Sequence, residues 1–410
     1  MTPHAADLRR AFWAVIAALM CVHATMAATR VAGSLWLLQT HHPAWMVGAL
    51  LSLYALAPLG LSLWAGRLAD RHGLHRPLAV GVAMGLLGPV LLVVHLDVVT
   101  LALSALFTGG AVSVAAVAIQ REAGQMAHSP DDLRRVFSWV ALGPALSNAI
   151  SPVVVGLLID HAGFRSAFFF AALLPVAAWA AGRRVPRASD QAGPSTLAGA
   201  VDDGGVGGGA SPARAPAAWT LLAIVPLRRL ILVNLALSSC WDAHSFAVPV
   251  MGHDRGLSAS AIGTVLGSFS VAATGVRLAI SRFAPRLDER AALCGAMAVA
   301  AATSALYPFL PGLATMIAGS FVLGLALGSV QPMVLSMLHQ VTPARRRGQA
   351  LGLRMLCTNA ATLVMPTMFG ALAAGTAAAA PMWLMAALVG AALVPARRIA
   401  APHETEVRVA

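Results

Sequence analysis

The chain has 410 residues, of which 58% are hydrophobic and only 11% are charged, and its formal net charge is +12. A mean hydropathy of +0.77 lies well above that of soluble globular domains of this length, so composition excludes an ordinary soluble fold. No soluble basic module is visible, so the positive charge does not imply a nucleic-acid partner. Apolar runs of about 20 residues, long enough to cross a lipid bilayer, recur along the chain and predict a polytopic helical membrane protein.

Twelve membrane-spanning helices are predicted, with six on each side of a polar segment. The first six cover residues 11–37, 44–65, 78–96, 98–119, 136–159 and 166–181. The second six cover residues 230–250, 260–280, 291–310, 313–337, 350–372 and 381–394. The intervening residues 183–217 are polar and rich in Gly, Pro and Ser, which predicts a flexible linker. We therefore expect an N-terminal six-helix bundle (1–182), this cytoplasmic linker, a C-terminal six-helix bundle (218–397) and a cytoplasmic tail (398–410).

The N-terminal segment permits an alternative interpretation as a cleavable signal peptide. DLRR, AFWAVIAALMCV and ATMAA follow one another as the charged, apolar and small-residue regions of such a peptide do. Removing the segment would leave an odd number of spans and break the pairing of halves described below. We therefore favour a retained first span.

Arginine carries all of the basic charge, because the chain contains no lysine. All but five of the 28 basic residues fall in the N-terminal tail, in the loops after spans 2, 4, 6, 8 and 10, or in the C-terminal tail. The exceptions are Arg165 and Arg255 in loops on the other side, and Arg30, Arg277 and Arg354 inside spans. The positive-inside rule therefore predicts that both termini and the central linker lie in the cytoplasm. We expect a multi-pass protein of the cell inner membrane.

The two halves of the sequence resemble each other at a nearly constant offset. A shift of 215 residues places Gly48 on Gly263, Tyr54 on Phe269, Gly60 on Gly275, Arg67 on Arg282 and Arg71 on Arg286. A shift of 214 places Gly110 on Gly324, Pro152 on Pro366 and Gly156 on Gly370. Each match is weak alone, but the shared offset indicates a duplicated six-helix unit, from which many transporters are built.

The loop between spans 2 and 3, residues 66–76, reads GRLADRHGLHR. It resembles the signature loop of the major facilitator superfamily, G-x-L-A-D-R-x-G-R-K, although Leu74 and His75 replace the usual Arg and Lys. The matching residues are Gly66, Leu68, Ala69, Asp70, Arg71 and Gly73. SPDDLRR (129–135) and TPARRRGQALG (342–352) resemble other cytoplasmic loops of the family. The resemblance covers the whole chain and is nearest to bacterial drug and metabolite exporters of the 12-helix type.

This resemblance implies an all-α polytopic membrane protein with 12 transmembrane helices in two pseudo-twofold-related six-helix bundles. In the family, the loop aspartate is thought to latch the N-terminal bundle onto span 11 when the transporter faces outward. Span 11 begins just after Arg345, Arg346 and Arg347, so Asp70 would meet a positive helix end as well as cations. We therefore expect Gly66, Asp70, Arg71 and Gly73 to form a conformational latch; a positive-inside anchor is the alternative.

Span 5 contains ALGPALSNAISPVVVGLLID and partly resembles the glycine–proline motif of proton-coupled exporters, which packs span 5 against span 8. Gly143, Pro152 and Gly156 carry the match, whereas Ser151 replaces a glycine of the motif. The alternative is that any crowded membrane helix accepts small residues and proline. Span 4, LFTGGAVSVAAVA, lacks the arginine of many exporters, so proton coupling would use other groups.

Charged side chains inside spans are costly and indicate function. Span 7 contains SSCWDAHSFAVP, which places Asp242 and His244 near the middle of the bilayer, and span 1 contains His23 and Arg30. The internal repeat puts Arg30 and Asp242 at similar depths, where they could pair across a cavity. Because carboxyl and imidazole groups can titrate near neutral pH, we predict that Asp242, with His244 or His23, responds to protons. A static ion pair that only fixes helix packing is the alternative.

Two arginines of the C-terminal half are candidates for a substrate cavity. Arg277 and Arg354 lie about a turn and a half from the cytoplasmic ends of their spans and would either contact substrate or snorkel to the interface. The remaining cavity candidates are Asn148, Gln331 and Trp241. Helix packing is the alternative for the asparagine and the tryptophan. Three intramembrane arginines against one aspartate would favour an anionic or zwitterionic substrate.

No feature of the sequence predicts a cofactor, a metal site or an enzyme. The four cysteines lie far apart inside predicted spans and suggest neither a disulfide framework nor a zinc site. A Walker-type GxxxxGK[ST] motif is absent, which argues against an ATP-driven pump within this chain, and no nucleophile and base stand together.

The sequence therefore predicts a monomeric secondary active transporter whose partners are the lipid bilayer, protons and a small-molecule substrate. The resemblance implies that two bundles rock around a central cavity. We favour proton-coupled efflux of a drug or of a secreted metabolite such as a siderophore. Proton-coupled uptake of a small organic anion is the alternative, and a non-transporting membrane receptor or assembly protein on this scaffold is the alternative from another class.

Overall fold

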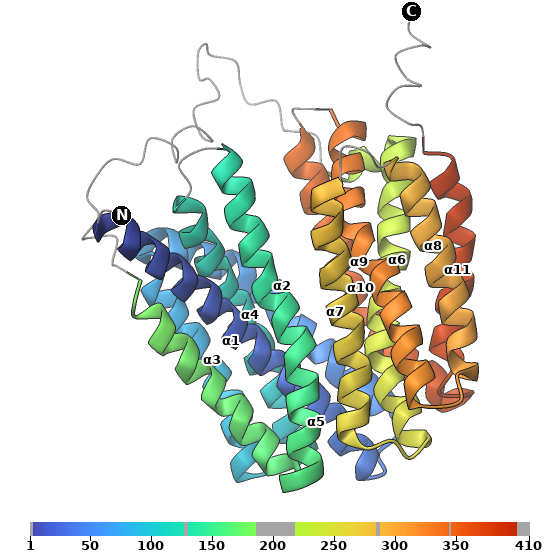
Figure 1. The fold of residues 1–410 in the computed structure, drawn as a ribbon, viewed down its shortest axis with the longest axis horizontal. Helices are drawn as coiled ribbons and strands as arrows, with labels where there is room; N and C mark the ends of the chain where they lie inside the picture. The colour runs from blue at the N-terminus through green and yellow to red at the C-terminus, as the bar shows by residue number, and fades with distance from the viewer. Residues whose placement is uncertain (1–2, 127–129, 186–217, 284–287, 344–345, 400–410) are drawn as a thin grey trace, which may run out of the picture. The chain divides into compact units, whose positions relative to one another are not determined.

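The computed structural model describes residues 3–126, 130–185, 218–283, 288–343 and 346–399, and all regular structure in these ranges is helical. Before residue 186 the helices are α1 (Pro3–Gln39), α2 (Ala44–His72), α3 (His75–Val94), α4 (Val98–Gln125) and α5 (Pro130–Gly182) (Figure 1). After residue 217 they are η3 (Ala218–Ala223), α6 (Val225–Asp254), α7 (Ala259–Phe283), α8 (Glu289–Leu306), η5 (Tyr307–Phe309), α9 (Leu313–Val341), α10 (Arg347–Gly375) and α11 (Ala380–Arg397). The predicted all-α fold is confirmed.

The helices account for the twelve predicted spans. Ten stretches in the described part of the chain are long and apolar enough to cross a membrane. The stretch in α5 contains two spans, because Gly163 interrupts it with non-helical backbone (φ 77°, ψ 176°). The twelfth span is α6, which is not among the ten because Asn234, Asp242 and His244 lower its hydropathy.

Contacts between residues divide the chain into two compact units. The first consists of Met1–Arg30, Leu56–Ser151 and Ala162–Ala215, and the second of Val31–Ala55, Pro152–His161 and Pro216–Ala410. The second unit therefore contains the C-terminal end of α1, the N-terminal part of α2 and the middle of α5, in addition to α6–α11. The division into two bundles and a linker at residues 183–217 remains a prediction, and most of that linker lies outside the described residues.

In the first unit, small residues bring α3 and α4 into close contact. A methyl group added to Gly81 of α3 would lie 2.9 Å from the Cβ atom of Ala115 of α4. One added to Gly88 would lie 2.9 Å from the methyl group of Thr108. Without small residues at these positions the two backbones could not approach so closely, as is general for contacts between membrane helices.

Two helix contacts in the second unit repeat the same geometry, and we call them the α5–α7 seam and the α2–α10 seam. A methyl group on Gly263 of α7 would overlap the carbonyl oxygen of Pro152 of α5. One on Gly48 of α2 would overlap the carbonyl oxygen of Pro366 of α10. A second glycine in each seam touches backbone: Gly156 contacts Ala259 and Ser260, and Gly370 contacts Ala44 and Trp45. The glycines and prolines that align in the internal repeat therefore make equivalent contacts.

The turns that precede α2 and α7 are also equivalent. His41 has φ 60° and Gly256 has φ 68°, and the two residues are 215 positions apart. The amide of His41 donates to the carbonyl of Leu38 (3.0 Å), and that of Gly256 donates to the carbonyl of His253 (2.9 Å). The first turn thus places a histidine where the second has glycine, the residue that left-handed backbone favours.

Candidate substrate pocket

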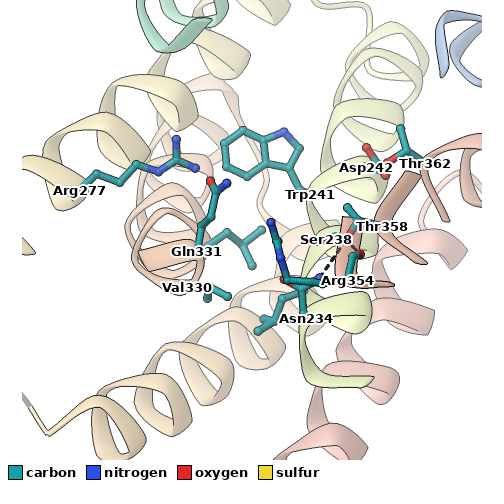
Figure 2. A pocket seen from close by; sticks show the side chains of 12 residues that line it. Asn234, Ser238, Trp241, Asp242, Arg277, Val330, Gln331, Arg354, Thr358 and Thr362 are labelled. Carbon is teal, nitrogen blue, oxygen red and sulfur yellow. Dashed lines mark hydrogen bonds between the residues drawn. The ribbon is translucent and has the colours of Figure 1, made fainter. Parts of the chain in front are cut away.

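A pocket of about 310 Å³ lies among α6, α7, α9 and α10 of the second unit (Figure 2). Its polar side chains from α6 and α10 are Asn234, Ser238, Asp242, Arg354, Thr358 and Thr362. Arg277 of α7 and Gln331 of α9 complete the polar part, and Trp241 forms an aromatic wall. The pocket therefore combines two cations, one carboxyl group, neutral hydrogen-bonding groups and an apolar surface, as small-molecule sites commonly do.

Helical periodicity explains why these residues meet. Asn234, Ser238 and Asp242 follow one another at intervals of four residues along α6, and Arg354, Thr358 and Thr362 do the same along α10. Side chains four residues apart lie on one face of a helix. The pocket is thus lined by polar stripes on two otherwise apolar helices.

The guanidinium group of Arg354 is held by a short hydrogen-bond network. Its Nη1 donates to Oδ1 of Asn234 (3.3 Å), whose Nδ2 donates to Oγ1 of Thr358 (2.9 Å). Thr358 donates in turn to the carbonyl of Arg354 (3.0 Å), so its hydroxyl oxygen is available to accept. This order of donors turns the amide oxygen of Asn234 toward the arginine.

Arg277 is fixed from a different side of the pocket. Its Nε donates to the carbonyl of Gly328 on α9 (3.2 Å), and its guanidinium carbon lies 5.7 Å from the ring centre of Trp241. The indole is in turn packed edge-on against Phe269 at 4.5 Å. A cation over an indole face is a stabilising arrangement. Both arginines line the pocket, where they could contact a solute, and their role in binding remains a prediction.

Asp242 and His244 lie on different sides of α6. Asp242 lines the pocket and is 7% exposed. His244 is fully buried; its Nε2 is 2.8 Å from the hydroxyl of Ser320, and its ring stacks on Phe269 at 4.3 Å. The hydroxyl of Tyr307 lies 2.7 Å from the same serine. Two residues correspond to about 200° around a helix, so His244 does not share the pocket with Asp242.

The other predicted site residues of the spans lie in the first unit. His23 and Arg30 of α1 are half-buried. Asn148 donates to the carbonyl of Pro144 in its own helix (3.0 Å). Because Arg30 and Asp242 belong to different units, their pairing remains a prediction, as do the proton-coupling roles of His23 and His244.

The glycine–proline residues of span 5 have different neighbours. Gly143 packs against α1, where an added methyl group would lie 3.4 Å from the amide nitrogen of Met20. Pro152 and Gly156 lie in the α5–α7 seam, so they face the eighth predicted span. The structure thus places two of the three motif residues beside α7.

The predicted latch residues lie in the last turns of α2 and in the turn that connects α2 to α3. Asp70 and Arg71 are exposed, and Gly73 adopts φ 64° where α2 gives way to α3. The carboxylate of Asp70 lies 3.2 Å from Nε of Arg121 on α4. An exposed ion pair of this kind contributes about 0–1 kcal/mol. Gly66 is half-buried in α2, and Arg345 lies outside the described residues; the contact of Asp70 with span 11 remains a prediction.

Four polar pocket residues were absent from the sequence predictions: Asn234, Ser238, Thr358 and Thr362. Their four-residue spacing on one helix face was the available signal. In the described ranges, no three His, Cys, Asp or Glu side chains are placed to hold a metal ion.

Comparison with known proteins gives the class first. The helical fold matches a solved structure titled "Crystal structure of a POT family transporter in complex with 5-aminolevulinic acid", with a TM-score of 0.72 over 94% of this chain and 95% of that chain. The identity is 11%, so this likeness shows a shared fold. No curated protein matches the sequence. The fold is therefore one that this chain shares with a solved membrane transporter.

The family follows from the sequence itself. The model of the Major Facilitator Superfamily matches residues 15–313 and 230–409. The matches extend over both halves of the chain, and the protein belongs to this superfamily. The resemblance carried by the loop at 66–76 is thereby confirmed.

Proposed function

We propose that this secondary transporter moves a small organic anion or zwitterion by alternating access, in exchange for protons and in the direction of efflux. The observation that carries the substrate class is the pocket, in which Arg277 and Arg354 face a solute-sized space together with Asp242. Hydrogen bonds to ionised groups are about twice as strong as those between neutral groups, so two guanidinium groups favour a carboxylate or phosphate. Asp242 would accept an amine or a proton.

The POT family transporter of similar fold was solved with 5-aminolevulinic acid, which carries a carboxyl and an amino group. A zwitterion of this size would place its carboxylate near the two arginines and its amine near Asp242. This compound is therefore a suitable first probe. Citrate and benzoate are suitable anionic probes, because they lack the amine.

Transport in sided membrane vesicles tests the proposal. Inside-out and right-side-out vesicles would be incubated with each labelled probe in the external medium, and label accumulated inside would be recorded with an imposed pH gradient of either sign. Efflux predicts proton-driven accumulation inside inside-out vesicles, whereas uptake predicts accumulation in right-side-out vesicles. No pH-dependent flux of any probe in either orientation would contradict the proposal.

Two pocket variants and one control connect the flux to the pocket. Arg354→Gln and Asp242→Asn should each weaken transport by about tenfold or more, because each removes a charge from the site. Arg228→Gln removes an exposed charge from α6 outside the pocket and should leave transport unchanged. A non-transporting receptor or assembly protein would instead be favoured if Asp70→Asn and Asp242→Asn both left the cellular phenotype untouched.

A further inference from the structure

The first turn of α7 obtains its hydrogen-bond acceptors from two helices. Ser258, which precedes the helix, accepts from the amide of Ala261 with its hydroxyl oxygen (3.2 Å). The amides of Ala259 and Ser260 donate to the two carboxylate oxygens of Asp160 on α5, at 3.0 and 2.8 Å. Helices leave their first amides without intrahelical acceptors. Asp160 therefore completes from another helix a cap that the sequence around Ser258 leaves unfinished.

A carboxylate suits this position better than any neutral side chain. Its two oxygens each accept from one amide, and its negative charge lies at the positive end of the α7 dipole. The side-chain amide of asparagine has the same shape but offers only one acceptor and places donors against a backbone amide. The geometry at Asp160 thus depends on the carboxylate and not only on side-chain size.

The backbone beneath this contact leaves no room for a side chain. Gly156, one turn before Asp160, touches the backbone of Ala259 and Ser260. Gly263, one turn into α7, touches the carbonyl of Pro152. Because only backbone atoms separate the helices, moving the first turn of α7 away from α5 must break both bonds to Asp160.

From this geometry we infer that Asp160 is a positioning residue that holds the first turn of α7 on α5, and that its two hydrogen bonds break whenever transport opens this end of the α5–α7 seam. The gating half of the inference rests on the alternating-access cycle proposed above. Four residues after Gly370, the position equivalent to Asp160 is Ala374, which carries no carboxylate. The α2–α10 seam therefore has no carboxylate at the position equivalent to Asp160.

Hydrogen–deuterium exchange of the full chain in lipid nanodiscs tests the bonds directly. Asp160→Asn should raise the exchange rate of at least one of the Ala259 and Ser260 amides by about tenfold or more, since asparagine offers one acceptor and no charge. Ser258→Ala should raise exchange at Ala261, because the Ser258 hydroxyl accepts from that amide. Asp254→Asn, a change in an exposed carboxyl at the end of α6, should have no effect on these amides. Unchanged exchange in Asp160→Asn would overturn the assignment.

Sided labelling of a pocket thiol tests gating separately. The reporter is Thr362→Cys in a chain whose four native cysteines are replaced by alanine. A membrane-impermeant thiol reagent would be applied to right-side-out and inside-out vesicles. Asp160→Asn should raise the labelling rate from one side and lower it from the other, each by several-fold, whereas Asp254→Asn should leave both rates unchanged.

The outcomes separate the two halves of the inference. If Asp160→Asn and Asp254→Asn label alike, Asp160 is only a structural cap and its gating role is wrong. If the reporter reacts from a single side in every variant and at every pH, the alternating-access cycle fails and the gating role fails with it. The exchange result then still decides whether Asp160 holds α7.

Discussion

The α5–α7 seam and the α2–α10 seam have the same backbone geometry but different polar contacts. In each, a glycine touches the carbonyl oxygen of a proline that the internal repeat aligns. The α5–α7 seam also contains the carboxylate of Asp160, which accepts hydrogen bonds from two backbone amides of α7. Among the described residues of the α2–α10 seam, the hydroxyls of Ser52 and Thr367 instead lie 2.8 Å apart. Duplication has thus preserved the close approach, whereas the polar contacts differ.

The difference separates two kinds of constraint. A backbone carbonyl cannot move aside for a new side chain, so the glycines are required by packing wherever the duplicated geometry persists. Hydrogen bonds contribute about 0.5–1.5 kcal/mol each between neutral groups and about 1.5–3 kcal/mol when one group is charged. We therefore expect the two seams to tolerate the same substitutions in their glycines but to differ in resistance to separation.

The largest effect is expected where the seams are alike. Gly263→Ala and Gly48→Ala should each lower the free energy of unfolding by about 1–3 kcal/mol, because the new methyl group overlaps a proline carbonyl. The matched controls are Gly275→Ala and Gly60→Ala, a second aligned pair that has open space around it. Thermal unfolding of the purified variants measures this, and equal losses at both pairs would contradict the packing account.

The next effect concerns the turns that lead into the seams. His41→Gly should stabilise the protein by about 1 kcal/mol, because glycine relieves a left-handed backbone conformation that histidine adopts at a cost. Gly256→Ala introduces the same cost in the equivalent turn and should destabilise by a similar amount. Thermal unfolding midpoints should therefore shift in opposite directions; a shared direction would show that the turns are not equivalent.

A smaller loss is expected at the hydroxyl contact of the α2–α10 seam. Ser52→Ala and Thr367→Val should each cost about 0.5–1.5 kcal/mol, and the double variant should cost little more than either alone. A double-mutant cycle on thermal stability checks this coupling. Strictly additive losses would mean that the two hydroxyls act independently.

Transplanting the carboxylate would reduce the difference between the seams. Ala374→Asp places an acidic side chain at the position equivalent to Asp160, near the first turn of α2. A side-chain cap of this kind contributes about 0.5–2 kcal/mol, so we expect a stabilisation at the lower end of that range. Ala374→Asn is the control without charge. If the aspartate variant is no more stable than the asparagine variant, the two seams are equivalent in backbone geometry only, and position 374 cannot cap α2 as Asp160 caps α7.

The smallest effect is expected from a carboxylate that caps only its own helix. The amide of Thr100 donates to Asp97 at the start of α4 (2.7 Å). Hydrogen bonds from the Thr100 backbone, and then from its side chain, lower the pKa of Asp97. This contribution is present above the ordinary aspartate pKa of about 3.9 and is lost as the pH falls through the lowered value. Asp97→Asn should slightly flatten the acid side of the stability curve, without altering sided labelling.

Much of the fold could be predicted from sequence because a bilayer requires long apolar helices. Within α5, one span ends and the next begins at Gly163. The sequence did not single out this glycine, because only its positive φ shows that it interrupts the helix. The aligned glycines predicted the internal repeat, but they did not predict which helices pack together. Their contact with proline carbonyls depends on which helices meet, and no local pattern records that.

The site was predictable in part. Trp241, Asp242, Arg277, Gln331 and Arg354 were selected because polar or large side chains stand out in apolar spans, and all five line one pocket. Asn234 and Thr358 were missed because such residues are common in membrane helices, although they hold Arg354 in place. His244 was grouped with Asp242 by closeness in sequence, whereas helical rotation places it against Phe269.

The polarity of α6 has a consequence for how the chain enters the membrane. Asn234, Asp242 and His244 leave this helix less apolar than its neighbours, and an aspartate near the middle of a span costs about 2.5–3.5 kcal/mol during translocon-mediated insertion. Asn234 and His244 find their hydrogen-bond partners on α10 and α9, which are synthesised later. Ribosome-bound chains that end soon after α6 should therefore leave this helix poorly integrated until the later helices emerge.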